Sequence, residues 1–127
     1  MIAVQSANCA PISAAYKDPD HWKKDFSPMS SIAHGLAVPF PFGMNLIMKT
    51  LAESNGEVIN VTEKEIMDGI SEIATREGIF VSPEGSAAWK ALVHLKQKGT
   101  IKEEDTILLL NTASGYKYIE NFSSLIK

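Results

Sequence analysis

The stretch Leu108-Leu-Leu-Asn-Thr-Ala-Ser-Gly-Tyr-Lys117 decides the fold class of this chain. It begins inside a predicted strand, Thr106 to Leu110. Ile107 to Leu110 of this strand are all apolar, as in a strand with helices on both faces of its sheet. Small and hydroxyl-bearing residues and a glycine follow immediately. In α/β sheets, groups at the carboxyl end of a strand face the crevice in which ligands bind. The stretch therefore predicts an α/β fold with a ligand site near Thr112.

The sequence before this stretch alternates between strand-like and helix-like patterns. Strands are predicted at residues 2–5, 57–61, 79–81 and 106–110, and helices at 11–16, 43–55, 62–77, 83–98 and from 116 onward. Such alternation predicts a mostly parallel sheet flanked by helices. Residues 17–31 are predicted to form a polar loop. Residues 32–42 are apolar but broken by Gly35, Pro39 and Pro41, so this loop is expected to be covered or to line a pocket.

The predicted helices have recognisable ends. Thr62-Glu-Lys-Glu65 is a capping box, in which the Thr side chain caps the backbone and the Glu side chain reaches back. Ser82 is the expected N-cap of a helix that has Pro83 at its first position. Three glycines are predicted to end helices: Gly56, Gly78 and Gly99.

The composition bounds the classes of function. A length of 127 residues predicts one domain, a single α/β unit over residues 1–127. The net charge is −3 and the basic residues are scattered, which argues against a nucleic-acid partner. The single cysteine, Cys9, excludes an internal disulfide and a Cys-rich metal site, and is expected to be a buried residue rather than a nucleophile. No apolar run reaches the roughly 20 residues of a membrane helix, and no signal peptide is recognisable, so we expect no membrane contact and a cytoplasmic location.

Three segments could carry a site, and each has a simpler interpretation. The Asn111–Gly115 segment could bind a ligand through its two hydroxyls and a close backbone approach at Ala113 and Gly115. Its simpler interpretation is an ordinary strand-to-helix turn. The Ser82–Ser86 segment could bind an anion at a helix N-terminus, although simple capping, with Glu84 complementing the helix dipole, is favoured. The Ile32–Pro39 loop could line a pocket with His34 in acid–base work, or be a covered loop with a solvated histidine. No metal-ligand spacing or nucleotide motif occurs, so these residues alone name no reaction.

Four segments in order resemble one enzyme family. Residues 2–8, 31–39, 77–88 and 109–117 are similar to the C-terminal part of the pyridoxal-phosphate enzymes of the tryptophan-synthase β-subunit superfamily, fold type II. Among these the chain is most similar to the threonine synthases. The resemblance covers essentially all of the chain and implies a partial large domain of that fold.

The resemblance also implies a set of site residues. The family's Thr-Gly-x-Gly strand end is Thr112-Ala113-Ser114-Gly115 here, with one glycine replaced, and these residues are expected to bind pyridoxal 5'-phosphate. Thr112 takes the place of the hydroxyl that hydrogen-bonds the pyridine nitrogen, and a neutral hydroxyl leaves that nitrogen largely unprotonated. The family often has Glu-Pro where this chain has Ser82-Pro83. In this chain the nearest glutamate, Glu84, lies two places after Ser82. The expected pocket lining is Ala33, His34, Gly35, Leu36 and Glu84.

The resemblance places the catalytic lysine elsewhere. The family's Schiff-base lysine, in a Ser-x-Lys motif, and its Gly-rich phosphate cup precede the part seen here, so no catalytic residue is expected in this chain. A strand directly after Met1 also suggests a piece of something longer. The complete enzyme would be a lyase of threonine biosynthesis that converts O-phosphohomoserine and water into threonine and phosphate, and the chain alone is expected to be inactive.

Other interpretations stay open. The chain could belong to a threonine dehydratase or a cysteine synthase, or be a freestanding α/β ligand-binding or interaction module without catalysis. The expected partners are a small amino-acid substrate and either a second copy or the missing part of the enzyme, because unpaired sheet edges seek partners.

Overall fold

The computed structural model describes residues 1–24 and 26–122. They fall into two compact units, Met1–Glu63 and Lys64–Lys127, and each unit is described by itself. The part of the helix predicted from Tyr116 onward that falls after residue 122 lies outside the described residues.

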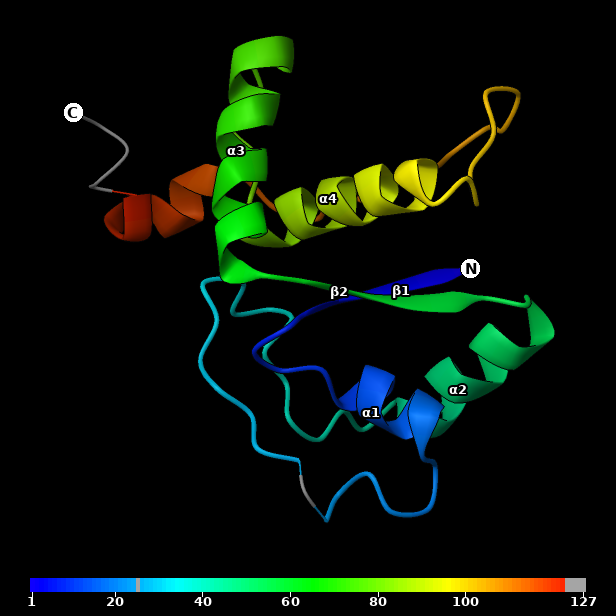
Figure 1. Ribbon diagram of the computed structural model, residues 1–127. Helices are drawn as coiled ribbons and strands as arrows, with labels where there is room; N and C mark the ends of the chain where they lie inside the picture. Colours follow the sequence, from blue (N-terminus) through cyan, green and yellow to red (C-terminus); the bar gives the residue numbers. More distant parts are fainter. Residues whose placement is uncertain (25, 123–127) are drawn as a thin grey trace. The chain divides into compact units, whose positions relative to one another are not determined.

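The first unit is built on a parallel strand pair, as the alternating sequence pattern predicts. Strand β1 (Ile2–Ser6) pairs with β2 (Glu57–Val61) in a register that sets Ile2 opposite Glu57. The helices α1 (Pro11–Lys17) and α2 (Met44–Glu53) lie in the connection between the strands, and α1 packs against both strands (Figure 1). Parallel strands need such a long crossover. The α/β class is confirmed.

A buried polar network ties α1 to both strands. Gln5 Oε1 on β1 accepts a hydrogen bond from the Ser13 backbone N–H at 3.0 Å. The Asn60 side-chain amide on β2 donates to Ser13 Oγ at 3.0 Å. Apolar residues complete the core around this network: Cys9, Ile12, Ala15, Leu51 and Val61.

Helix α2 ends through Asn55 rather than Gly56, which corrects the predicted cap. Asn55 has a φ of 46°, in the left-handed region. The Gly56 N–H donates to the Leu51 carbonyl at 2.8 Å, and the Asn55 N–H to the Ala52 carbonyl at 3.4 Å, the pattern of a Schellman motif. Gly56 is small for another reason, because a Cβ there would collide with the Met1 carbonyl and the Leu51 side chain.

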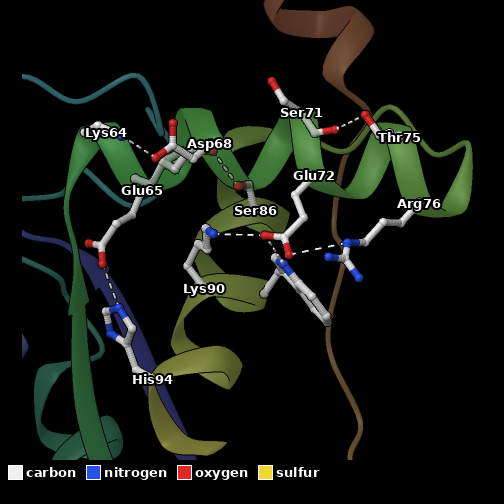
Figure 2. A network of polar contacts seen from close by, with 12 residues as sticks. Lys64, Glu65, Asp68, Ser71, Glu72, Thr75, Arg76, Ser86, Lys90 and His94 are labelled. Carbon is white, nitrogen blue, oxygen red and sulfur yellow. Dashed lines mark hydrogen bonds and ion pairs between the residues drawn. The ribbon is translucent and has the colours of Figure 1, made fainter. Parts of the chain in front are cut away.

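The second unit is dominated by the crossing of α3 (Glu63–Glu77) and α4 (Pro83–Gln97), shown in Figures 1 and 2. Ile66 and Ile70 of α3 are buried, as are Ala87 and Ala91 of α4. At the crossing, a Cβ on Gly69 would meet the Ser86 hydroxyl and the Lys90 side chain. The absence of a side chain at Gly69 therefore lets the two helices approach closely.

Polar contacts beside the crossing join α3 to α4 (Figure 2). Glu72 accepts from Lys90 Nζ at 2.9 Å and from the Trp89 indole N–H at 3.2 Å. These two donors, with Lys90 the larger cause, hold the pKa of the Glu72 carboxyl below its ordinary value. Glu65 Oε1 lies 2.7 Å from His94 Nε2.

The predicted start of α4 and the predicted ends of both helices are confirmed, while the capping box at Thr62–Glu65 stays a prediction. Ser82 Oγ accepts from the Gly85 N–H at 3.3 Å, and Pro83 stands at the first helical position. Gly78 and Gly99 follow the two helices with φ values of 66° and 75°. Glycine adopts this region without the strain that a Cβ brings.

Two predicted strands do not form in the described part of the chain. Residues 106–110 are irregular, and Leu108 and Leu110 are 85% and 68% exposed. A strand that is apolar on both faces needs neighbouring strands in its sheet, and in the described residues no strand pairs with this segment. In residues 79–81, only Val81 makes a bridge, an antiparallel one with Ser114.

Candidate cofactor site

The segment predicted to bind the cofactor lines an open hollow in the second unit. Thr112, Ala113 and Ser114 stand on one side of it. Phe80 and Tyr116 contribute aromatic rings to the same hollow. The remaining lining residues are Gly78, Ile79 and Asn111. The structure thus brings the three predicted residues together at one surface.

Backbone contacts to residues 80–81 fix the position of this segment. The Gly115 N–H donates to the Phe80 carbonyl at 2.9 Å, beside the bridge between Val81 and Ser114. A Cβ on Gly115 would lie 2.8 Å from both the Phe80 ring and the Val81 carbonyl oxygen. The predicted close backbone approach therefore exists at Gly115, although it is made to the protein's own chain.

The helix that follows is short and begins at this segment. The 3-10 helix η1 spans Gly115–Phe122, and Ser114 Oγ accepts from the Tyr116 N–H at 3.4 Å. The Phe80 ring packs edge-on against Tyr116 and Phe122, at centroid distances of 5.3 and 5.5 Å. Phe122 is buried, so this aromatic group anchors η1 and leaves Tyr116 exposed at the hollow.

Glu84 lies outside the lining of the hollow. Its Oε1 accepts a hydrogen bond from the Tyr118 hydroxyl at 2.7 Å, which links α4 to η1. This hydrogen bond, with a smaller contribution from burial, raises the pKa of Tyr118 to about 12. The contact assigns Glu84 a structural partner, whereas its predicted place in the pocket lining stays a prediction.

The other predicted lining residues lie in the first unit. Ala33 is fully buried, while His34 and Gly35 are exposed and Leu36 is half-buried. The Leu36 N–H donates to the Ala33 carbonyl at 2.9 Å, which closes a turn over these four residues. Sequence reasoning correctly predicted an irregular loop here.

Several residues around these segments were not predicted. Phe80 and Tyr116 give the hollow its aromatic side chains. Phe80 lies two places after Gly78 and Tyr116 directly after Gly115, and this nearness to glycine was the available signal. Glu63 was also missed as a partner of the loop, because its contacts join residues far apart in sequence. Ile32 N–H donates to Glu63 Oε2 at 2.8 Å, a separation of 31 residues.

A second hollow, of about 530 Å³, lies in the first unit. Trp22, Phe40, Met44 and Met48 are among its lining residues. It contains none of the residues at which the resemblance places the cofactor. Within the described residues, no group of three or more His, Cys, Asp and Glu side chains is arranged to hold a metal ion. Cys9 is buried, which raises the pKa of its thiol, as expected of a structural cysteine.

Comparison with known families decides the class of protein. The family described as "Pyridoxal-phosphate dependent enzyme" matches residues 1–113, nearly the whole chain. The chain belongs to the pyridoxal-phosphate dependent enzymes. The match ends inside the candidate site, after Thr112 and Ala113. Pyridoxal phosphate is therefore the cofactor of the complete enzyme.

Individual relatives narrow the comparison within the pyridoxal-phosphate enzymes. The chain is 30% identical over 124 residues to "Threonine synthase 2, chloroplastic" of Arabidopsis thaliana, covering 95% of this chain and 23% of that protein. It is 30% identical over 87 residues to the threonine synthase of Halalkalibacterium halodurans, which covers 68% of this chain and 25% of that protein. It is 26% identical over 81 residues to the cysteate synthase of Methanosarcina barkeri, which covers 63% of this chain and 20% of that protein. The chain spans about a quarter of the length of these relatives.

The chemistry of the lining residues is compatible with a planar aromatic ligand such as a pyridoxal ring. Thr112 offers an exposed hydroxyl, and Phe80 and Tyr116 offer aromatic surface to a planar ligand. The small side chain of Ala113 leaves space beside that hydroxyl. The hollow therefore combines aromatic surface with a neutral hydrogen-bonding group. In the described residues, no helix is both long and apolar enough to cross a membrane.

Proposed function

We propose that this chain is the C-terminal portion of a threonine synthase-like enzyme. The complete enzyme would convert O-phosphohomoserine and water into threonine and phosphate, and would be a lyase of threonine biosynthesis. The observation that carries the proposal is the family match over residues 1–113, together with similarity to two threonine synthases. The single α/β unit expected over residues 1–127 stays a prediction.

Thr112 is the residue to which we assign the cofactor's pyridine nitrogen. When bound, pyridoxal phosphate supplies an electron sink for reactions at the α and β carbons of amino acids. Thr112 lines the open hollow, and its hydroxyl would donate a hydrogen bond to that nitrogen. A neutral hydroxyl leaves the pyridine nitrogen largely unprotonated, whereas a carboxylate partner would hold it protonated. Thr112 thereby moderates the electron sink, which suits elimination and replacement at the β carbon.

The Ala33–Leu36 loop is proposed to border the substrate side of the same cofactor. His34 and Gly35 of its turn are exposed, while Ala33 is buried. Ala113 and Ser114 accompany Thr112 at the ring. Glu84 is proposed only as a neighbour of the site, since its described contact is to Tyr118.

The chain by itself is proposed to be inactive, because the catalytic lysine belongs to the remaining part of the enzyme. Its partners would be that remaining part, a small amino-acid substrate and a second copy, and its compartment would be the cytoplasm. A direct check is to incubate the chain with pyridoxal phosphate, reduce with borohydride and locate adducts by mass spectrometry. We expect scattered, substoichiometric labelling. A stoichiometric adduct at one lysine would show that this chain carries the cofactor lysine itself.

Product analysis of the complete protein tests the reaction. The full-length enzyme is supplied in turn with O-phosphohomoserine, with threonine, and with O-acetylserine plus sulfide. Phosphate release with threonine formation is expected in the first mixture. Ammonia release from threonine would identify a dehydratase instead, and cysteine formation would identify a cysteine synthase. Absence of all three products from a cofactor-loaded protein would favour the non-catalytic alternative.

A further inference from the structure

One carboxylate in the first unit receives hydrogen bonds from two segments far apart in sequence. Ser6 Oγ, at the end of β1, donates to Glu63 Oε1 at 2.7 Å. The Ile32 N–H, at the entry of the apolar loop, donates to Glu63 Oε2 at 2.8 Å. Ser6 is fully buried. Both oxygens of Glu63 are therefore used, one for the strand end and one for the loop.

Further hydrogen bonds hold the loop entry to the same strand end. The Met29 N–H donates to the Asn8 carbonyl at 2.7 Å, and the Asn8 side-chain amide donates to the Ser30 carbonyl at 2.8 Å. The Asn8 N–H in turn donates to Ser6 Oγ at 3.1 Å. Ser31 Oγ accepts from the Ala33 N–H at 3.1 Å. Residues 29–33 are thus fixed immediately before the turn at Ala33–Leu36.

A carboxylate suits the bridge between Ser6 and Ile32 better than a neutral side chain does. A carboxylate accepts at both oxygens, whereas an amide side chain accepts at one and donates at the other. Hydrogen bonds to a charged acceptor are also stronger than those between neutral groups. Glu63 is the first residue of α3, where the helix dipole favours negative charge. The start of α3 therefore places a strong double acceptor between β1 and the loop.

We infer that Glu63 is a positioning residue, which sets the Ala33–Leu36 loop for the cofactor and substrate through its bridge to Ser6 and Ile32. This inference rests on the proposed function, because that proposal places the loop beside the cofactor. It goes beyond the proposal by naming the group that holds the loop. The hydrogen bonds of Glu63 go to Ser6 and to the Ile32 backbone, so its effect would be transmitted through the loop backbone.

The test uses variants of the complete protein. Glu63→Ala removes both acceptors, and Glu63→Gln keeps one acceptor oxygen. Ser6→Ala removes one arm of the bridge and leaves the negative charge at the start of α3. Asp68→Ala is the matched control, because this exposed carboxylate on the same helix pairs with Lys64 at 2.6 Å. An effect shared by Glu63→Ala and Ser6→Ala but not by the control cannot come from the helix dipole.

The first readout is hydrogen exchange by mass spectrometry on peptides that span residues 29–37. Loss of a hydrogen bond to a charged acceptor is expected to speed exchange of the Ile32 amide about tenfold or more in Glu63→Ala. Glu63→Gln and Ser6→Ala should show smaller increases, while peptides from β2 keep their protection in every variant. Unchanged exchange in Glu63→Ala would overturn the inference.

The second readout separates positioning from stability. The bound cofactor's fluorescence and the KM for the amino-acid substrate should shift in Glu63→Ala, with Glu63→Gln between it and the parent. Faster loop exchange with unchanged fluorescence and KM would show that the loop does not serve the site, and would overturn the inference. If the parent makes no threonine from O-phosphohomoserine, the proposed reaction fails alone, and the fluorescence and exchange readouts still decide the role of Glu63.

Discussion

At the residue scale, the hydrogen bond between Tyr118 and Glu84 gives a structural partner to Glu84, the residue that the family motif singled out. The Tyr118 hydroxyl donates to the Glu84 carboxylate at 2.7 Å, and the pKa of Tyr118 rises to about 12. The raised pKa means that the folded protein binds the phenolic proton more tightly than the unfolded chain does. The hydrogen bond therefore stabilises the fold while Tyr118 is protonated.

A pH series measures this contribution. Because the pKa is raised in the folded state, the stabilisation is complete below pH 10, the ordinary tyrosine value, and is lost as pH rises through about 12. Tyr118→Phe should lower the free energy of unfolding by about 1 kcal/mol at pH 8. Urea unfolding of both proteins should show the difference shrinking above pH 10. A constant difference up to pH 12 would contradict the assignment.

Gly115 gives a second prediction at this scale. Its added Cβ would stand 2.8 Å from the Phe80 ring and the Val81 carbonyl oxygen, too close for either to stay in place. Gly115→Ala should destabilise the second unit by about 1–3 kcal/mol, the range of overpacking substitutions. Ser114→Ala keeps the backbone contact and should cost less. Urea unfolding of the two variants compares them, and equal stability would show that this close approach is not tight.

At the element scale, the end of α2 has two adjacent positions that favour glycine for different reasons. Asn55 adopts the left-handed conformation, whereas Gly56 is confined by the Met1 carbonyl and the Leu51 side chain. Asn55→Gly should stabilise the unit slightly, and Asn55→Ala should destabilise it by about 1 kcal/mol. Gly56→Ala should cost more, because it clashes with backbone. Thermal unfolding of the three variants checks this order, and Asn55→Ala matching the parent would contradict it.

The same scale shows which elements the sequence could predict. Ser82, Pro83, Gly78 and Gly99 act on their own helices, so their local signals were sufficient for the bounds of α4 and the end of α3. The strand expected at 106–110 depends on partners distant in sequence, and local apolarity could not reveal whether they are present. The prediction chose Gly56 as the cap because glycine favours the left-handed region, whereas in the structure Asn55 adopts it. The close approach of Gly56 to the Met1 carbonyl joins residues far apart in sequence and gave no local signal.

The candidate site was predictable to a similar degree. Thr112, Ala113 and Ser114 were singled out by the hydroxyl residues after an expected strand and by the family resemblance. They line a hollow, and their role in binding the cofactor stays a prediction. The role of Glu63 was not predictable, because its partners Ser6 and Ile32 lie 57 and 31 residues away. Contacts at such separations follow from the fold and leave no periodic signal in the sequence.

At the scale of the whole molecule, the apolar segment 106–110 predicts self-association of the isolated chain. Ile107, Leu108 and Leu110 are exposed, and exposed apolar segments of this kind seek a partner. Light scattering over a range of concentrations should show dimers or larger species. Leu108→Lys, at an 85% exposed position, should reduce association without lowering the thermal midpoint. Association that is absent in the parent, or unchanged in Leu108→Lys, would exclude this segment as its cause.

The central claim about the whole molecule is that Thr112 holds the cofactor ring in a threonine synthase-like enzyme. The most direct measurement is the pyridoxal-phosphate dissociation constant and kcat on O-phosphohomoserine for the complete protein and its Thr112→Ser and Thr112→Ala variants. Serine keeps the hydroxyl and should stay within a few fold of the parent. Alanine should lose about tenfold or more in one or both quantities, the value of one buried hydrogen bond. Equal values in the alanine variant and the parent would contradict the claim.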